Sequence, residues 1–390
     1  MIVTGFKMSY RKIARIPPWT LVAAVLTALL LLGTSGPIKA QGQITKDFPR
    51  VGWQPTWAAP GSHYVGGQAC AKCHVSEATT QPSTPMAQAL SHIADCQILI
   101  SHPTLSVKLG RFTYHITTND GHATYTVTDG SRSLTFPLLY ALGQGNAGQT
   151  YLYESGGLYY ESQVSYFNAI CGLDLTLGHS PAAPTNLEDA AGVRLSNGDA
   201  MRCFACHSTA AVTSGGLQLT HMTPGITCEG CHGPGGGHVA AVRSGNMGDL
   251  HIFNPGKLAP DDLVDFCASC HRGALDVADL NVSGVRTVRF QPYRLILSHC
   301  FENSGGRLSC LSCHDPHLTV QTGAAYYDAK CLACHGDQHS SGLKQAVKLK
   351  VCPVSQKNCV TCHMPKYELP GGHFKFTDHD IRIARAGYPD

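Results

Sequence analysis

Seven segments of the chain share the spacing Cys-x-x-Cys-His. Two cysteines three residues apart lie on one face of a single helical turn, so both thiols can reach the two vinyl groups of one porphyrin. The histidine that follows then lies beneath the ring, where its nitrogen can bind the iron. This spacing is the attachment signal for c-type haem. In chain order, motifs one to seven are Cys70/Cys73/His74, Cys203/Cys206/His207, Cys228/Cys231/His232, Cys267/Cys270/His271, Cys310/Cys313/His314, Cys331/Cys334/His335 and Cys359/Cys362/His363.

Zinc ribbons and disulfide frameworks are the alternative uses of so many cysteines. A zinc ribbon combines two Cys-x-x-Cys units and needs no histidine after each one. A disulfide framework would not repeat one spacing seven times. We therefore predict seven covalently attached haems c.

Length and composition suggest how these cofactors are packed. Seven haems in 390 residues leave too little chain to wrap each haem in its own apolar domain, because a domain core needs roughly 100 residues. The 41 glycines and 22 prolines favour short turns over long helices. We predict a multihaem cytochrome c fold of mostly short α-helices and loops packed around stacked haems, with a small antiparallel β insertion.

The first forty residues have the features of a secretory signal. A basic segment precedes a short apolar run at residues 21–32, and Ala40 offers a small residue for cleavage. An uncleaved anchor is the alternative, but the run is short for a bilayer span. Five of the 29 basic residues and none of the 26 acidic ones lie in residues 1–40, so the remainder carries a net charge of −2. We expect export across the inner membrane to the periplasm or cell surface, and no nucleic-acid partner.

The spacing of the motifs divides the chain unevenly. We predict a signal peptide at residues 1–40, a single-haem unit at 61–104, a β-rich insertion at 105–170 and a six-haem block at 171–390. In the insertion, residues 112–117, 125–128 and 133–136 alternate apolar and polar side chains around Asn-Asp-Gly and Asp-Gly turns. A second hairpin is predicted at residues 151–160. We expect this meander to cover haem one or the surface of the haem block, and its aromatic stripe to be core.

Each iron needs a sixth ligand or an open position, and fourteen histidines lie outside the motifs. His317 follows His314 by three residues, too few for the chain to pass around a ring edge, so His317 binds a different haem or none. The same argument applies to His238, which ends a glycine-rich loop after His232.

Further candidate ligands lie in loops or in the C-terminal tail. Asp378, which directly precedes His379, is predicted to accept a hydrogen bond from a histidine ring N–H. Met86 is an alternative soft ligand for haem one, with packing as its other role. The additional candidate distal ligands are His102, His179, His373 and His379.

Four cysteines lie outside the motifs: Cys96, Cys171, Cys300 and Cys352. In an oxidising compartment they can form two disulfides. Cys300–Cys352 is the preferred pair, and the other connectivities stay open.

Three segments resemble a family of secreted bacterial multihaem cytochromes c. They are residues 201–207, residues 224–235 and the Cys-His-Met-Pro-Lys of residues 362–366. The resemblance extends over roughly residues 60–385. The family looks related to the tetrahaem cytochrome that accepts electrons from hydroxylamine oxidoreductase. The motifs are also similar to those of pentahaem nitrite reductase and octahaem enzymes. It implies that His238 and His317 are distal ligands to other haems. The chain lacks the Cys-x-x-Cys-Lys motif of those nitrite reductases, which argues against nitrite reduction.

These observations predict a heptahaem electron carrier more than a substrate-converting enzyme. Irons with two histidine ligands pass single electrons and have no position for a substrate. Expected partners are redox proteins, either a quinol oxidase-type donor or a terminal reductase, with membrane contact only through the signal or a partner. One alternative is an oxidoreductase acting on a small nitrogen or sulfur compound at a five-coordinate haem, placed at haem one. The other is a subunit of a homo-oligomeric filament.

Overall fold

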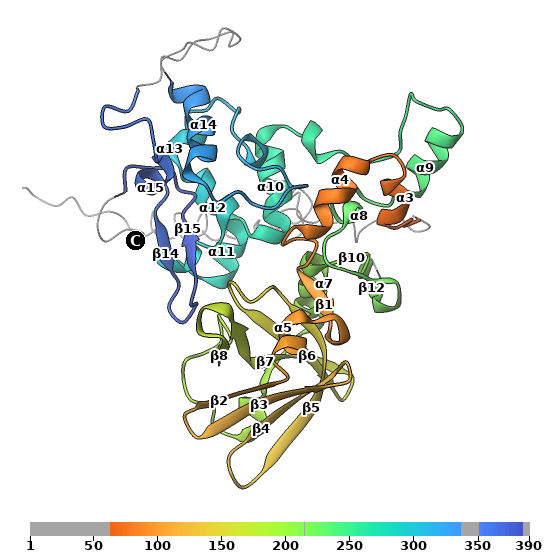
Figure 1. Cartoon of the computed structure of the whole chain (residues 1–390), viewed down its shortest axis with the longest axis vertical. Coiled ribbons are helices and arrows are strands. Elements are labelled where there is room, and N and C mark those ends of the chain that lie inside the picture. The colour runs from red at the N-terminus through yellow and green to blue at the C-terminus, as the bar shows by residue number, and fades with distance from the viewer. Residues whose placement is uncertain (1–62, 214, 337–350, 385–390) are drawn as a thin grey trace, which may run out of the picture. The chain divides into compact units, whose positions relative to one another are not determined.

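The computed structural model describes residues 63–213, 215–336 and 351–384, all within one compact unit (Figure 1). The predicted signal at residues 1–40 lies outside the described residues. Within those ranges, no helix is both long enough and apolar enough to cross a bilayer.

Nine strands of the described residues form one antiparallel sheet. Strands β2 to β8 follow one another in chain order, while β1 pairs with β5 and β9 pairs with β7. The sheet curls so that β2 also contacts β8. The strands are β1 (Leu90–His92), β2 (Thr104–Leu109), β3 (Phe112–Asn119), β4 (His122–Thr128), β5 (Ser133–Leu142), β6 (Gln149–Ser155), β7 (Leu158–Phe167), β8 (Gly172–Leu175) and β9 (Gly192–Arg194).

The predicted hairpins are confirmed. Strands β3 and β4 pair from Thr113 with Thr128 to Asn119 with His122. The two residues between them, Asp120 and Gly121, have φ values of 48° and 76°, the left-handed conformation that a two-residue hairpin turn requires. The second predicted hairpin is formed by β6 and β7.

The predicted fold class is wrong, because the β region is a large sheet and not a small insertion in a mostly helical chain. Alternation of apolar and polar residues in the sequence identified only the strands that have one exposed face. The ten-residue strand β7 ends in six consecutive buried residues, so both of its faces are covered there. A continuous buried run has no period of two, and periodicity alone does not distinguish it from a buried helical segment.

Aromatic side chains fill the core of the sheet, as predicted for the aromatic stripe. Tyr114, Tyr125 and Tyr153 are each at most 1% exposed. The ring of Tyr153 lies 4.4 Å from Phe136 and 5.2 Å from Tyr160, centroid to centroid, and both pairs are stacked. Stacked pairs of this kind add to the stability gained from burial alone.

Short helices make up most of the regular structure outside the sheet. The α-helices are α3 (Gly67–Ala71), α4 (Val75–Thr80), α5 (Gln97–Ser101), α6 (Leu187–Ala191), α7 (Asn197–His207), α8 (Cys228–His232), α9 (Gly236–Arg243), α10 (Pro260–His271), α11 (Ala274–Leu280), α12 (Gln291–Ile296), α13 (His299–Glu302), α14 (Ala324–His335) and α15 (Cys359–His363).

Single 3-10 turns and two-stranded pairs complete the described structure. The pairs are β10–β13, β11–β12 and β14–β15. The 3-10 turns are η2 (Gln81–Ser83), η3 (Ile93–Asp95), η4 (Asn168–Ile170), η5 (Leu219–His221), η6 (Pro255–Lys257), η7 (Gly284–Thr287) and η8 (Cys310–Ser312). The paired strands are β10 (Ser208–Thr209), β11 (Val212–Thr213), β12 (Gly216–Leu217), β13 (Thr223–Pro224), β14 (Lys366–Glu368) and β15 (Lys375–Thr377).

The sheet packs on the helix that carries motif two. Phe204 of α7 is fully buried, with its ring 5.1 Å from Tyr140 and 5.8 Å from Tyr159. These side chains belong to a second apolar cluster that also includes Leu152 and Leu195. The sheet therefore positions motif two directly.

A close backbone contact positions motif three. The N–H of Ile226 donates to the carbonyl of Met86 at 2.8 Å. Gly225 has a φ of 74°, and a Cβ there would collide with the carbonyl of Ala87. Glycine is needed because the chain is both left-handed and in backbone contact at this point.

Candidate metal centres

Each Cys-x-x-Cys-His motif forms a helical turn, as the spacing predicted. Motifs two, three, four, six and seven end α7, α8, α10, α14 and α15. In motifs one and five the amide of the histidine (His74 or His314) donates to the carbonyl of the first cysteine at 2.9 Å. The turn brings the two thiols of each motif to one side of the backbone.

The second cysteine is exposed in four of the motifs. These residues are Cys73, Cys270, Cys334 and Cys362. Cys270, Cys334 and Cys362 each come one residue before the end of a helix, and Cys73 follows α3. Attachment of haem at these thiols stays a prediction.

All eighteen cysteines, which all lie within the described ranges, are free thiols. The preferred Cys300–Cys352 disulfide is therefore not formed. Cys96 is buried instead, and its thiol lies 3.1 Å from the Gln149 Oε1. Burial raises the pKa of Cys203 and of Cys231 to about 12, so both are protonated thiols at neutral pH.

In the described part of the chain, three motif histidines each face a histidine from elsewhere. The ring centroids are 6.3 Å apart for His74 and His238. They are 6.2 Å apart for the pair His232–His317 and for the pair His314–His379. Each distal ring thus comes from a segment that follows a different motif.

These separations fit an iron between the two rings. Imidazole nitrogen binds a metal at about 2 Å, and the ring centre lies about 1 Å further away. Two trans imidazoles therefore have centroids about 6 Å apart, the spacing of all three pairs. The cysteines that precede His74, His232 and His314 supply the two thiols needed for covalent attachment, so the residues present fit haem c.

Backbone carbonyls orient three of these six rings. The Nδ1 of His232 lies 2.9 Å from the carbonyl of Phe253, that of His238 lies 2.9 Å from Leu250, and that of His379 lies 3.0 Å from Thr377. A ring whose Nδ1–H donates to a carbonyl presents the lone pair of Nε2 to a metal. Two further motif histidines have the same contact: His207 with Ala89 and His363 with Arg382.

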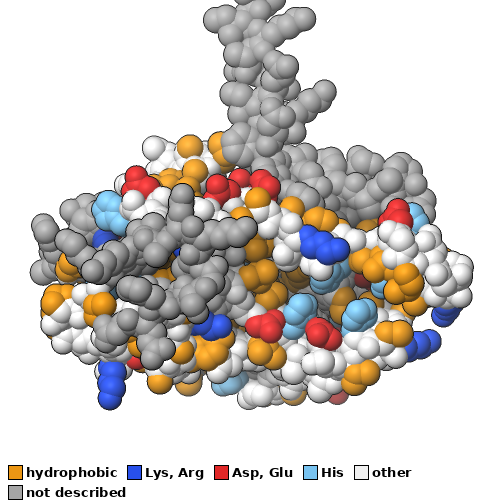
Figure 2. All heavy atoms as spheres, turned by 90° about the horizontal axis from the view of Figure 1, so that it is seen from above, with side chains coloured by type: hydrophobic (Ala, Val, Ile, Leu, Met, Phe, Trp, Pro, Cys, Tyr) orange, Lys and Arg blue, Asp and Glu red, His pale blue; other side chains and the backbone are white. Residues whose placement is uncertain are grey.

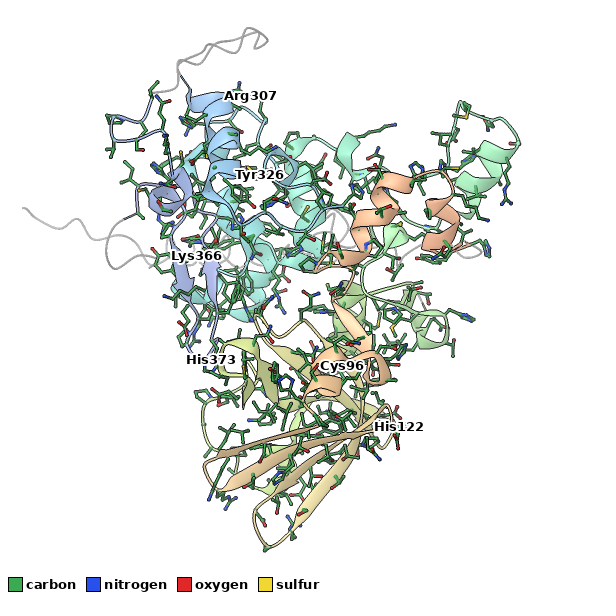
Figure 3. The ribbon with its side chains drawn as sticks, in the orientation of Figure 1. Cys96, His122, Arg307, Tyr326, Lys366 and His373 are labelled. Atoms are coloured by element: carbon green, nitrogen blue, oxygen red, sulfur yellow. The ribbon has the colours of Figure 1, made fainter. Side chains whose placement is uncertain are left out.

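Three of the other candidate distal histidines are engaged by protein groups instead. The two ring nitrogens of His102 face the Ile98 carbonyl and the Tyr166 hydroxyl. Those of His179 face Gln163 and Glu161, each at 3.0 Å. His373, at the tip of the β14–β15 hairpin, contacts Asp174 of β8 at 2.7 Å (Figure 3). None of the three faces a motif histidine.

The residue predicted to hold the ring of His379 has another role. Asp378 is fully buried and accepts from Arg294 Nε and from Arg382 Nη1, each at 2.8 Å. Asp380 joins the same cluster. Burial lowers the pKa of His379 to about 4, so the neighbouring ring is neutral at pH 7 and able to bind a metal.

Two buried carboxylates connect motifs to one another. Glu229, inside motif three, is 3% exposed and accepts from the amides of Val65, Gly66 and Gly235 at 2.8–2.9 Å. It therefore holds the start of the helix that carries motif one. Asp328, ahead of motif six in α14, accepts from the amides of Asn358 and Cys359 at 2.8 Å, at the start of motif seven.

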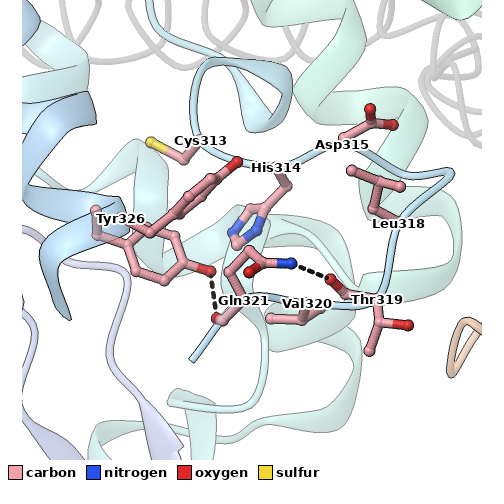
Figure 4. Close-up of a pocket in the computed structure, with 9 residues that line it drawn as sticks. Cys313, His314, Asp315, Leu318, Thr319, Val320, Gln321 and Tyr326 are labelled. Atoms are coloured by element: carbon pink, nitrogen blue, oxygen red, sulfur yellow. Dashed lines mark hydrogen bonds between the residues drawn. The ribbon is translucent and has the colours of Figure 1, made fainter. Parts of the chain in front are cut away.

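Helix contacts bring further motifs together. α3 contacts α8, α7 contacts α10, α10 contacts η8 and α14 contacts α15. A shallow, partly open pocket lies beside His314 of motif five. The Tyr327 hydroxyl donates to the Gln321 carbonyl at 2.8 Å. Figure 4 shows the side chain of Gln321, which donates to the Thr319 carbonyl, in the lining of this pocket. Histidine side chains are also visible among apolar ones on the face shown in Figure 2.

The sequence did not reveal which histidines face each other. The pairs are 164, 85 and 65 positions apart along the chain, so no local spacing connects them. Among the described residues, His207, His271, His335 and His363 have no second imidazole stacked opposite. The described residues also contain no group of three or more His, Cys, Asp or Glu side chains that could hold a metal ion by themselves.

Residues 181–233 match the family model described as Cytochrome c554 and c-prime. The match includes motifs two and three. No curated protein and no solved structure matches the chain. The match supports a c-type cytochrome with covalently attached haem c and a role in haem-based electron transfer.

Proposed function

We propose that the chain is a heptahaem cytochrome c that passes single electrons along neighbouring haems. The proposal rests chiefly on the three histidine pairs, whose centroid separations of 6.2–6.3 Å fit two axial imidazoles on one iron. Haem iron, when bound, cycles between its ferric and ferrous states and so carries one electron. The chain's own residues attach, orient and space the haems.

The distal ligands follow from the pairs. His238 completes haem one, His317 completes haem three and His379 completes haem five. The helices of motifs one and three, two and four, four and five, and six and seven are in contact, which supports the proposal that the haems bound to them would be neighbours. Close neighbours of this kind favour electron transfer within each group.

Location and partners follow from the residues expected at the N-terminus and from the chemistry of the carrier. We propose that the protein acts in the periplasm or at the cell surface, between an electron donor that oxidises quinol and a terminal reductase. Export would suit covalent attachment of haem c, which takes place outside the cytoplasm.

Substitution of the distal histidines tests the proposal. In His238→Ala, His317→Ala and His379→Ala, one ferric haem per protein should change from low spin to high spin, measured by electron paramagnetic resonance. His102→Ala is the matched control, because its ring is held by Ile98 and Tyr166. Intact mass should show seven haem additions in every variant. Fewer than seven additions, or unchanged spin states in all three variants, would refute the proposal.

A second candidate function is favoured by the surroundings of motif two. His207 has no described imidazole stacked opposite, and burial lowers its pKa, with smaller effects of opposite sign from Glu161 and Arg272. Glu161 contacts His179, whose side chain is 6% exposed. Such a group of titratable side chains beside an open iron would suit an oxidoreductase acting on a small nitrogen or sulfur compound.

Carbon monoxide distinguishes the two functions. A carrier with every iron six-coordinate should not change its reduced absorption spectrum when carbon monoxide is added. An enzyme with an open iron at motif two should bind one equivalent, and His207→Ala should change that binding. Carbon monoxide binding that His207→Ala changes would indicate an open iron at haem two and not at haem one, where the alternative was predicted.

A further inference from the structure

Four arginines of the described residues are shielded from solvent, and they divide into two pairs. Arg294 and Arg382 share the carboxylates of Asp378 and Asp380. Arg272 and Arg289 are half-buried, and no carboxylate of the described residues forms an ion pair with either one. A shielded charge without a counter-ion is costly, so this second pair lacks an anion.

The two guanidinium groups converge on one ring. Arg272 lies 5.5 Å and Arg289 lies 5.3 Å from the centroid of Phe290, which is 2% exposed. Burial and the charge of Arg272 lower the pKa of Arg289 to about 10, so both side chains stay positive at neutral pH. Two like charges beside one buried ring favour a nearby anion that both can bind.

The backbone at Arg272 gives an independent reason to assign it a role. Its φ is 67° and its ψ is 127°, a combination that favours glycine. A residue with a side chain in such a conformation costs on the order of 1–3 kcal/mol. Glycine is the usual residue just after a helix end, yet here it comes one position later, at Gly273. The chain has an arginine at this strained position and not a glycine, which indicates that the arginine side chain has a role.

The pair lies between two attachment motifs. Arg272 directly follows His271 of motif four. Motifs two and four are in contact, since the Cys206 thiol lies 3.6 Å from the Ser269 carbonyl.

The acid that acts on Arg289 belongs to another contact. The carboxylate of Glu161 contacts the His179 ring at 3.0 Å. It raises the pKa of Arg289 electrostatically but forms no ion pair with that arginine.

We propose that Arg272 and Arg289 form an anion-binding site between motifs two and four, which takes a carboxylate or a small oxyanion in a two-pronged guanidinium contact. The carboxylate source is a propionate of the haem at motif two or four, and the oxyanion source is a free anion such as nitrite or sulfite. The propionate source rests on the proposed haem attachment at these motifs.

The test uses the holoprotein and the variants Arg272→Gln, Arg289→Gln and Arg272→Lys. Arg286→Gln is the matched control, because Arg286 is exposed and only three residues from Arg289. Each protein is examined by potentiometric titration, by calorimetric titration with nitrite and with sulfite, and by intact mass with peptide mapping of the haems.

Each source predicts a different result. If a propionate occupies the site, both Gln variants lower the midpoint potential of at least one haem without any added anion, since an uncompensated carboxylate stabilises ferric iron. Arg272→Lys, which keeps the charge, then lowers it less. If a free oxyanion occupies the site, the native protein binds nitrite or sulfite saturably, and both Gln variants bind at least tenfold more weakly.

Failure of this proposal is distinguishable from failure of the proposed function. Seven haems by mass, with potentials and anion binding in both Gln variants equal to those of Arg286→Gln, would overturn the anion site alone. Haems missing from motifs two or four in the native protein would overturn the heptahaem proposal and the propionate source. In that case calorimetry alone would test the free-oxyanion source: saturable binding that both Gln variants weaken would support it, and no binding would contradict it.

Discussion

The sheet β1–β9 and the region that carries motifs two to seven are held by different kinds of buried group. In the sheet, the buried side chains are apolar, aromatic or uncharged polar. Every charged residue that is buried among the described residues lies at position 229 or later: Glu229, Asp276, Arg294, Asp328, Asp378 and Asp380. The comparison teaches that the sheet is held mainly by apolar packing. Motif two shares that packing, whereas segments that carry or flank motifs one, three, six and seven are held by carboxylates that accept from backbone amides and guanidinium groups.

The largest expected effect is in the sheet. Tyr125→Ala removes a fully buried aromatic side chain whose ring packs against Tyr114 and Tyr153. We expect a loss of about 4 kcal/mol in the free energy of unfolding, because a cavity replaces most of the ring. Urea denaturation followed by far-ultraviolet circular dichroism measures it. His122→Ala, exposed in the same strand, is the control and should change stability by less than about 0.5 kcal/mol.

The haem content separates the two regions in the same variant. If the sheet is held by its own packing, Tyr125→Ala should keep every haem that the native protein carries, as measured by mass. Loss of haem from motifs three to seven would show that the two regions depend on each other and would break the comparison.

The next effect is expected at Glu229. Glu229→Ala leaves three amides, those of Val65, Gly66 and Gly235, without their acceptor. We expect a loss of about 3 kcal/mol, since each unsatisfied buried donor costs about 1 kcal/mol or more. Hydrogen exchange should accelerate at residues 64–74 and stay unchanged in the sheet. Glu77→Ala, at an exposed position of α4, controls for the loss of charge, and equal exchange in the two variants would contradict the role of Glu229.

A smaller effect is expected at Asp328, which accepts from two amides. Asp328→Ala should cost about 2 kcal/mol and release residues 358–363 in hydrogen exchange. Asp328→Asn keeps one acceptor oxygen and should cost about half as much. If both substitutions affect exchange equally, the carboxylate does not act through its two hydrogen bonds.

The sequence predicted the hairpins and the helical turn at each motif, but not the size of the sheet or the partners of the histidines. The Asn-Asp-Gly turn and the alternation around it are local signals, and both appear in β3 and β4. The last six residues of β7 are buried on both faces, so they carry no alternation to read. Glu229 was equally hidden, because nothing in Cys-Glu-Gly-Cys-His shows that the carboxylate reaches amides more than 160 residues away.

His317 shows what the sequence alone can and cannot determine about axial partners. Local chain length excluded it as the partner of His314, an argument that needs only the three-residue spacing. That it faces His232 depends on the path of the whole chain between motifs three and five. Local geometry can therefore exclude an axial partner, while the choice among the remaining irons is made by tertiary structure.

The smallest expected effect is a gain in stability, opposite in sign to the loss expected for Tyr125→Ala. Tyr151 is fully buried in the sheet, and its hydroxyl has no hydrogen-bond partner among the described residues. Burial raises the pKa of this phenol well above its usual value, so the group stays neutral. Removing an unpaired buried hydroxyl removes a desolvation cost, so Tyr151→Phe should stabilise the protein by up to about 1 kcal/mol.

Tyr166→Phe is the matched control for Tyr151→Phe, because the Tyr166 hydroxyl lies 3.3 Å from the His102 Nε2. Loss of that hydrogen bond should destabilise the protein by about 0.5–1 kcal/mol. Urea denaturation of the two variants side by side gives the sign of each change. If Tyr151→Phe were as destabilising as Tyr166→Phe, the Tyr151 hydroxyl would have a polar partner, and the sheet would depend on buried polar contacts in the same way as the motif region.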